Sequence, residues 1–213
     1  MENCELSSRE MYDKLVLVFP ELDEWTKKDI IEFKKFLKND SVVLEVGCSW
    51  GRILKSLAPH CKKIIGIDNS DVEIKEAKFF LEDIPNSEVF YEDGEKTHFP
   101  DSFFDVIILA GNTFGNLSDK KENVIKEITR ILKKDGKILL SVYADGAKDL
   151  RIKAYRDIGL KADLKEDGTV IFEEGLLSEE FSKQQLEIIF KKFGLKVQFV
   201  DINSIAMLCI ASR

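Results

Sequence analysis

From residue 41 onward, short apolar runs alternate with longer amphipathic segments. Runs such as Val106–Ala110 and Ile138–Val142 are apolar almost throughout, which is typical of strands buried on both faces of a parallel sheet. Strands that alternate with segments of helical periodicity predict βαβ units whose helices cover both faces of the sheet. The expected strands are Ser41–Val46, Lys63–Asp68, Glu88–Tyr91, Asp105–Ala110 and Lys137–Tyr143, and the expected helices are Gly51–Ala58, Ser70–Leu81 and Ser118–Lys134.

The two ends of the chain depart from this alternation. Apolar residues at helical spacing predict helices around Glu10–Val18 and Trp25–Leu37, with Pro20 between them. Near the C-terminus the pattern predicts a helix over Glu179–Phe193, followed by an antiparallel hairpin of Leu195–Asp201 and Ser204–Ala211.

Residues 144–177 mix charged residues, glycine and aromatic residues without clear periodicity. A long stretch of this kind inside a compact domain is usually functional or disordered, and we interpret it as a cap insertion. The expected fold is therefore of the α/β class: a Rossmann-like, seven-stranded, mostly parallel sheet with an antiparallel last strand and helices on both faces. We expect a single domain over 1–213, with 1–40 as an N-terminal helical lid and 144–177 as the cap.

Composition narrows the class of protein. The 213 residues are 44% hydrophobic and carry a net charge of −7. No basic face stands out, which disfavours a nucleic-acid substrate, and no run of apolar residues is long enough to span a membrane. Because the N-terminal residues do not resemble a signal peptide, we expect a soluble cytoplasmic protein. Its four cysteines (Cys4, Cys48, Cys61 and Cys209) and two histidines lack metal-ligand spacing, so we expect no metal site.

The segment from Val42 to Arg52 carries the strongest functional signal. An apolar strand ends in Glu45, turns on Gly47 and enters a helix at Gly51, although close packing alone can also require such a glycine turn. The next strand ends in Asp68, and a carboxylate at that position can accept hydrogen bonds from both hydroxyls of a ribose. Together the two strand ends predict a nucleoside site.

Both NAD and S-adenosylmethionine fit a nucleoside site, and the glycine pattern separates them. A dinucleotide requires G-x-G-x-x-G so that the backbone can approach a diphosphate, whereas this loop reads G-C-S-W-G. Glu45 would repel a diphosphate but can hold the ammonium group of S-adenosylmethionine.

The sequence resembles class I S-adenosylmethionine-dependent methyltransferases in several consecutive segments. VLEVGCSWGRIL is similar to their first motif, E/D-x-G-x-G-x-G, with Ser49 in place of the middle glycine. KIIGIDNSDVEIKEAK is similar to the second motif, and YEDGEKTHFPDSFFDVIILAG to the stretch that closes the adenine pocket and forms the fourth strand. EITRILKKDGKILLSV and the C-terminal hairpin are similar to later elements, so that the resemblance covers about 40–143 and 178–213.

The resemblance implies S-adenosyl-L-methionine as cofactor, S-adenosyl-L-homocysteine as product, and a set of binding positions. Gly47, Cys48 and Gly51 would line the methionine moiety, and Glu45 would support its amine. The residues implied for the remainder of the cofactor are Asp68 for the ribose, Asn69 beside the adenine, Asp93 for the adenine amino group with the Gly94 backbone next to it, and Ala110 and Gly111 under the sulfonium.

Catalytic residues are harder to identify, because a sulfonium methyl group is already activated and mainly needs a nucleophile held in line. GNTFGNL after the fourth strand resembles a segment of glycine N-methyltransferase-like enzymes, which makes Asn112 a candidate. Tyr12, in a Tyr-Asp segment similar to one in the same enzymes, and Tyr143 are further candidates. Their alternative roles are a turn residue for Asn112 and packing for the two tyrosines.

The expected function is in-line methyl transfer to a nitrogen or oxygen atom of a small molecule. Three alternatives remain open at this point: a cofactor-binding protein without turnover, an RNA or protein methyltransferase, and an NAD(P)-linked oxidoreductase. We expect a monomer or a dimer, and the sequence does not identify the methyl acceptor.

Overall fold

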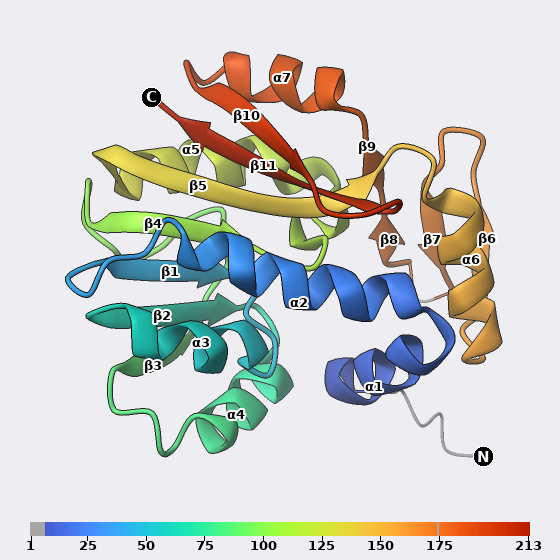
Figure 1. Cartoon of the computed structure of the whole chain (residues 1–213), viewed down its shortest axis with the longest axis horizontal. Coiled ribbons are helices and arrows are strands. Elements are labelled where there is room, and N and C mark those ends of the chain that lie inside the picture. Colours follow the sequence, from blue (N-terminus) through green and yellow to red (C-terminus); the bar gives the residue numbers. More distant parts are fainter. Residues whose placement is uncertain (1–6, 174) are drawn as a thin grey trace.

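The computed structural model describes residues 7–173 and 175–213, and it is built around one central sheet (Figure 1). Its main path runs in the order β10-β11-β5-β4-β1-β2-β3, and β11 is antiparallel to both of its neighbours. The strands of this path are β1 (Val42–Val46), β2 (Lys63–Asp68), β3 (Ser87–Tyr91), β4 (Phe104–Leu109), β5 (Leu132–Ala144), β10 (Lys196–Asp201) and β11 (Ala206–Ser212). This is the expected Rossmann-like α/β fold.

Helices cover both faces of the sheet and divide the hydrophobic core into two clusters. One cluster packs α2 (Pro20–Lys34), α3 (Arg52–Leu57) and α4 (Asp71–Phe80) against the sheet. The other packs α5 (Lys121–Ile131) and α7 (Lys183–Lys191) against the opposite face. Figure 1 shows α2 crossing in front of the sheet and α5 behind it.

Several expected helices begin or end elsewhere. The helix expected over Ser118–Lys134 is a 3₁₀ turn (η3, Ser118–Lys120) followed by α5, which ends at Ile131 because Leu132 already pairs with Phe104 of β4. The helix expected from Glu179 starts later: β9 (Glu180–Phe181) first pairs with the end of β5. Ser182 then caps α7 by accepting a hydrogen bond from the backbone of Gln185, whose side chain accepts from the Ser182 backbone in return.

The region expected as a cap contains α6 (Lys148–Asp157) and a small antiparallel sheet. Its strands are β6 (Ala162–Leu164), β7 (Val170–Phe172) and β8 (Leu177–Ser178), in the order β6-β7-β8. The fully buried Arg151 of α6 donates to the carbonyl oxygens of Ser178 (3.1 Å) and Gly168. This guanidinium therefore ties the helix of the cap to its sheet.

The N-terminal region forms α1 (Ser8–Val18) and α2, as expected, but α2 begins at Pro20 itself and ends at Lys34, whereas Trp25–Leu37 was the expected span. Ser7 and Glu10 form a capping box at the start of α1, and Trp25 of α2 donates its indole hydrogen to Ser141 Oγ in β5 at 2.5 Å. Cys4 belongs to the segment outside the described residues.

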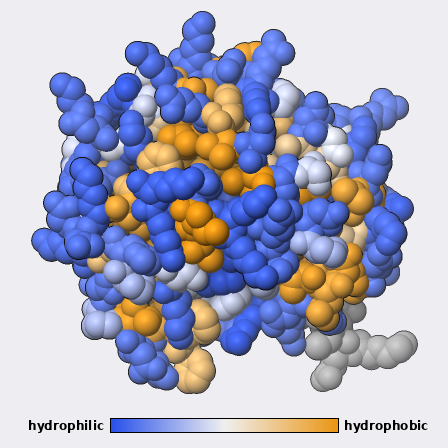
Figure 2. Space-filling model, viewed as in Figure 1, coloured by the Kyte–Doolittle hydropathy of each residue, from blue (hydrophilic) through white to orange (hydrophobic). Residues whose placement is uncertain are grey.

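The surface is largely hydrophilic on the side that Figure 2 shows, with hydrophobic residues scattered between charged ones. Within residues 7–173 and 175–213, helices that combine the length and the apolar character needed to span a membrane do not occur.

Candidate active site

A cavity of about 640 Å³ lies at the carboxyl ends of the parallel strands. The chain continues from β1 to β2 and β3 on one side and returns through β4 and β5 on the other, so β1 and β4 form the switch point where ligands of such sheets bind. Helices α1 and α2, Phe172 and residues 175–178 form the other walls. The expected site residues that line it are Tyr12, Glu45, Gly47, Cys48, Asp68, Asn69, Asp93, Gly94, Ala110, Gly111, Asn112 and Tyr143.

The loop after β1 is held in a conformation that suits glycine. The backbone amides of Gly47 and Cys48 both donate to the Ile67 carbonyl of β2, at 2.8 and 3.0 Å. Gly47 has a φ of +71°, and a Cβ at this position would lie 2.5 Å from the Thr113 side chain. Gly47 therefore allows both the turn and the close approach of the loop after β4.

Gly51 has a different place from the one expected. It does not line the cavity, and a Cβ added to it would meet Leu81 at 2.9 Å and Ala77 at 3.6 Å. Gly51 is the residue before the first turn of α3, and its φ of +90° is a conformation that favours glycine. The structure thus explains this glycine by close packing against α4 and by its backbone conformation, without a ligand.

Asp68 at the end of β2 organises the neighbouring loop. One carboxylate oxygen accepts from the backbone amide of Ser49 (2.9 Å), and the other accepts from that of Ser70 (2.9 Å). Burial raises the pKa of Asp68, although the two amide hydrogen bonds act against that shift. The carboxylate reaches the cavity and keeps lone pairs for hydroxyl donors.

Ser49, in place of the middle glycine of the first motif, has a φ of +47°, which is unfavourable for a residue with a side chain. Its hydroxyl donates to Glu73 of α4 at 2.6 Å. The second carboxylate oxygen of Glu73 accepts from the Ser8 amide of α1 at 3.3 Å. The sequence analysis missed Glu73 as a link between α1 and the loop, because both of these contacts are distant along the chain.

Glu45 is the most unusual group in the cavity. Its side chain is buried, and its Oε2 atom has no hydrogen-bond partner. Burial raises the pKa of Glu45 well above its usual range, the Arg52 guanidinium lowers it, and the nearby Asp68 raises it further. A buried, unpartnered carboxylate oxygen beside a cavity fits a cationic donor. Arg52, which also lines the cavity, was not among the expected residues.

The loop after β3 contributes a more exposed acidic group. Asp93 accepts from the Lys120 ammonium at 2.6 Å and from the Glu95 amide at 3.0 Å. Burial raises the pKa of this carboxyl, but the bonds to Lys120 and Glu95 outweigh it, so the pKa of Asp93 is lowered. Asn69 is exposed at the mouth of the cavity, and a Cβ on Gly94 would lie 3.0 Å from Val46.

After the end of β4, Gly111 leaves open space and the side-chain amide of Asn112 is held by hydrogen bonds. Gly111 has a φ of +58° and no atom within 4 Å of the position of an added Cβ. The buried Asn112 side chain donates to Ser178 Oγ (3.0 Å) and to the Glu179 carbonyl (3.1 Å), and it accepts from the Tyr143 amide (3.2 Å). Because both amide hydrogens are used within the protein, the structure gives Asn112 a bridging position between β5 and the cap.

The two candidate tyrosines lie on different walls. The Tyr12 hydroxyl of α1 is hydrogen bonded to Thr26 of α2 at 3.0 Å, and the Arg52 guanidinium lies 4.7 Å from the centre of its ring. The Tyr143 hydroxyl accepts from the Tyr155 hydroxyl at 3.3 Å. Burial raises the pKa of Tyr143 well above its usual range, so this phenol keeps its proton.

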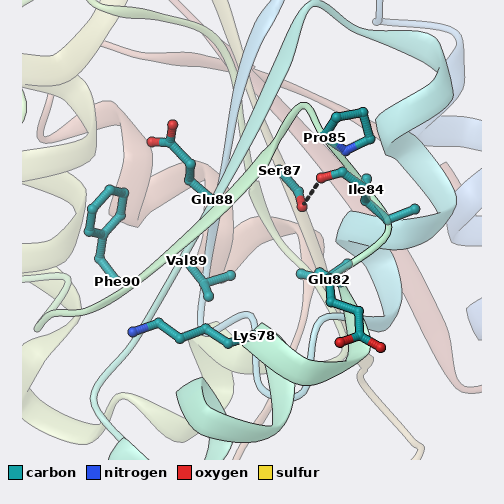
Figure 3. Close-up of a pocket in the computed structure, with 9 residues that line it drawn as sticks. Lys78, Glu82, Ile84, Pro85, Ser87, Glu88, Val89 and Phe90 are labelled. Carbon is teal, nitrogen blue, oxygen red and sulfur yellow. Dashed lines mark hydrogen bonds between the residues drawn. The ribbon is translucent and has the colours of Figure 1, made fainter.

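A second depression lies away from this site, between the end of α4 and the edge strand β3 (Figure 3). Lys78, Glu82 and Glu88 are among its residues, and the Ser87 hydroxyl donates to the Ile84 carbonyl at 2.8 Å. It contains none of the expected site residues. Across the described part of the chain, no group of three or more His, Cys, Asp or Glu side chains is arranged to hold a metal ion.

Comparison with known proteins identifies the class. The sequence model of a methyltransferase domain matches residues 43–136. The YcgJ protein of Bacillus subtilis has a TM-score of 0.69 at 17% identity, over 88% of this chain and 99% of that protein. An S-adenosylmethionine-dependent methyltransferase of Clostridium acetobutylicum has a TM-score of 0.68 at 16% identity, over 94% of this chain and 95% of that protein.

The complex described as DhpI-SAM-HEP is similar as well, with a TM-score of 0.69 at 15% identity over 95% of this chain and 92% of DhpI. A search of curated proteins found no match. The chain therefore has the fold of class I S-adenosylmethionine-dependent methyltransferases, and part of its sequence matches a methyltransferase domain. The sequence match to a methyltransferase domain is confined to residues 43–136.

Proposed function

We propose that this protein binds S-adenosylmethionine and transfers its methyl group to a nitrogen or oxygen atom of a small molecule. The observation that carries this proposal is the unpartnered Oε2 atom of the buried Glu45, at the end of β1 and beside the cavity. S-adenosylmethionine has an ammonium group that can supply the missing hydrogen bond and the missing positive charge. A diphosphate at the same position would add negative charge next to Glu45 and Asp68.

The residues around Glu45 suit the other parts of the same molecule. Arg52 offers a guanidinium to the carboxylate of the amino-acid moiety, and Asp68 offers acceptor atoms to the ribose hydroxyls. Asn69, Asp93 and the backbone of Gly94 border the end of the cavity proposed for the adenine. Gly47 and Cys48 are the residues of the loop after β1 that line the cavity, and a side chain on Gly47 would collide with Thr113.

The chemistry of the bound cofactor is the donation of a methyl group from sulfur to an attacking lone pair, with the bonding electrons returning to sulfur. The protein contributes position and the exclusion of water. Gly111, which is proposed to lie under the sulfonium together with Ala110, leaves open space at the end of β4. Tyr143 remains protonated and can orient the acceptor as a hydrogen-bond donor.

Binding is tested by isothermal titration with S-adenosylmethionine, S-adenosylhomocysteine and NAD. We expect the first two to bind and NAD not to bind, and tighter binding of NAD would favour an oxidoreductase. Turnover is tested by incubation with methyl-labelled cofactor and fractionated metabolite, RNA and protein pools. Label in the metabolite pool supports the proposal, label in RNA or protein contradicts the small-molecule acceptor, and binding without label in any pool supports a protein without turnover.

A further inference from the structure

The cavity has two halves that differ in chemistry. The strands follow one another across the sheet in the order β5, β4, β1, β2 and β3, with adjacent strands about 4.8 Å apart. Residues at the ends of β2 and β3 therefore lie on the opposite side of the cavity from those at the end of β5. The half at β1, β2 and β3 contains Glu45, Asp68, Glu92 and Asp93. The other half is lined by residues of α1, α2, the end of β5 and the cap, and we call it the acceptor compartment. Its principal lining residues are Tyr12, Leu22, Thr26, Tyr143, Tyr155 and Phe172.

The acceptor compartment is apolar and aromatic. Leucines and a methionine from α1, α2 and the 175–178 region complete its lining, together with the hydroxyls of Ser8 and Ser178. Among the described residues that α1, α2, β5 and the cap contribute to the cavity, none has a charged side chain. A charged group that enters this half therefore finds no opposite charge in the part of the lining that the structure describes.

Two arginines lie close to this half, and both are engaged. The Arg151 guanidinium lies 4.8 Å from the centre of the Tyr143 ring and is fully buried, and it donates to the Ser178 and Gly168 carbonyls. The Arg52 guanidinium lies over the Tyr12 ring and beside the Glu45 carboxylate, at the boundary with the other half. Because a cation already lies near each ring, these two rings are poor partners for a cationic acceptor.

The hydroxyls of Tyr143 and Tyr155 form a pair that can offer one hydrogen bond to a ligand in the acceptor compartment. The Tyr155 hydroxyl donates to the Tyr143 hydroxyl at 3.3 Å, so the hydrogen of Tyr155 is used within the pair. Tyr143 retains its own hydrogen for a ligand, while the rings of Tyr155 and Phe172 pack edge to face with centroids 4.9 Å apart.

We propose that the acceptor compartment takes an uncharged, mainly apolar or aromatic small molecule, oriented by one hydrogen bond from Tyr143 to an oxygen or nitrogen atom. This inference rests on the proposed function and specifies its substrate class. The physical reason is desolvation: burying an ion without a partner costs several kcal/mol, whereas burying an apolar ring is favourable.

The first experiment measures binding of four naphthalene derivatives by equilibrium dialysis, to protein saturated with S-adenosylhomocysteine at pH 7. Naphthol and naphthylamine are neutral, naphthoate is an anion and naphthylmethylammonium is a cation. We expect both neutral compounds to bind at least tenfold more tightly than either ion. Equal or tighter binding of an ion overturns the inference, as does absence of binding by all four compounds. Titration of S-adenosylhomocysteine alone is done first, and its failure to bind overturns the proposed function itself.

The second experiment tests the hydrogen bond with a matched pair of variants. Tyr143→Phe removes the hydrogen that the inference assigns to the ligand, and we expect naphthol to bind about five- to tenfold more weakly, with the affinity for unsubstituted naphthalene unchanged. Tyr155→Phe removes a hydroxyl whose hydrogen is used within the pair, and we expect less than a twofold change for naphthol. The reverse order, with the larger loss in Tyr155→Phe, would overturn the assignment to Tyr143. Unchanged binding of S-adenosylhomocysteine shows that both variants are folded.

Discussion

Replacing Glu45 by glutamine should change two quantities in opposite directions: the stability of the ligand-free protein should rise, and its affinity for S-adenosylmethionine should fall. Without ligand, Glu45 is only 3% exposed and one of its oxygens lacks a partner, so we expect Glu45→Gln to raise the free energy of unfolding by about 1 kcal/mol or more. With ligand, the variant loses a hydrogen bond to a charged donor. Such a bond contributes about 1.5–3 kcal/mol, which corresponds to roughly 10- to 150-fold weaker binding of S-adenosylmethionine.

The assay compares two ligands by isothermal titration. S-adenosylmethionine has the ammonium group, and methylthioadenosine has the same nucleoside without an amino-acid moiety. We expect Glu45→Gln to weaken only the first ligand. Asp68→Ala is the matched variant, and it should weaken both ligands by a similar factor with the fold intact, because it removes the acceptor assigned to the shared ribose.

Three results would contradict this reasoning about Glu45. If S-adenosylmethionine binds to Glu45→Gln within twofold of its affinity for the unchanged protein, the carboxylate does not hold the ammonium group. If methylthioadenosine loses as much affinity as S-adenosylmethionine, the substitution has altered the whole pocket. A lower unfolding temperature for the ligand-free variant would show that Glu45 has a structural partner.

Three further predictions concern stability, measured as the free energy of unfolding in urea. Ser49→Ala should be less stable than Ser49→Gly by about 1 kcal/mol, because both lose the hydrogen bond to Glu73 and only glycine relieves the positive φ; equal stability would show that this backbone is unstrained. Gly47→Ala should cost more than Gly159→Ala, since both glycines have positive φ but only Gly47 lacks room for a Cβ, and equal losses would contradict the steric argument. Burial raises the pKa of Asp29 from 3.8 to about 7, so the folded chain keeps a proton that the unfolded chain has released; stability should fall as pH rises through this range, and Asp29→Asn should reduce that slope.

The positions that the sequence predicted well are the ends of buried strands. Glu45 and Asp68 are recognisable because each follows an uninterrupted apolar run, and the parallel arrangement then brings both to one edge of the sheet. Gly47 is recognisable for the same reason. Gly51 shows the limit of this argument, because glycine serves packing and ligand approach equally well and the pattern does not distinguish them.

The structure of the cap and its contacts could not be predicted from apolar runs in the sequence. Its strands are two or three residues long, which is too short to show a period of two. A buried Arg151 has the same sequence signature as an arginine in solvent, and only its partners at Ser178 and Gly168 explain its burial. Glu73 likewise acts through residues far away in the chain.

The anchoring of the cap bears on how molecules reach the cavity, since some wall must move to admit them. Swinging the cap outward would separate the buried Arg151 guanidinium from the Glu180 carboxylate of β9 (3.7 Å) and the Tyr155 hydroxyl from that of Tyr143 (3.3 Å), and breaking a buried ion pair costs several kcal/mol. The beginning of α1 is held by a 3.3 Å hydrogen bond from the Ser8 amide to Glu73 and by a partly exposed ion pair of Arg9 with Glu76 (3.5 Å), which are easier to break. We therefore expect the first helix to move when molecules enter and leave the cavity, and the cap to keep its place as the wall that sets the shape of the space.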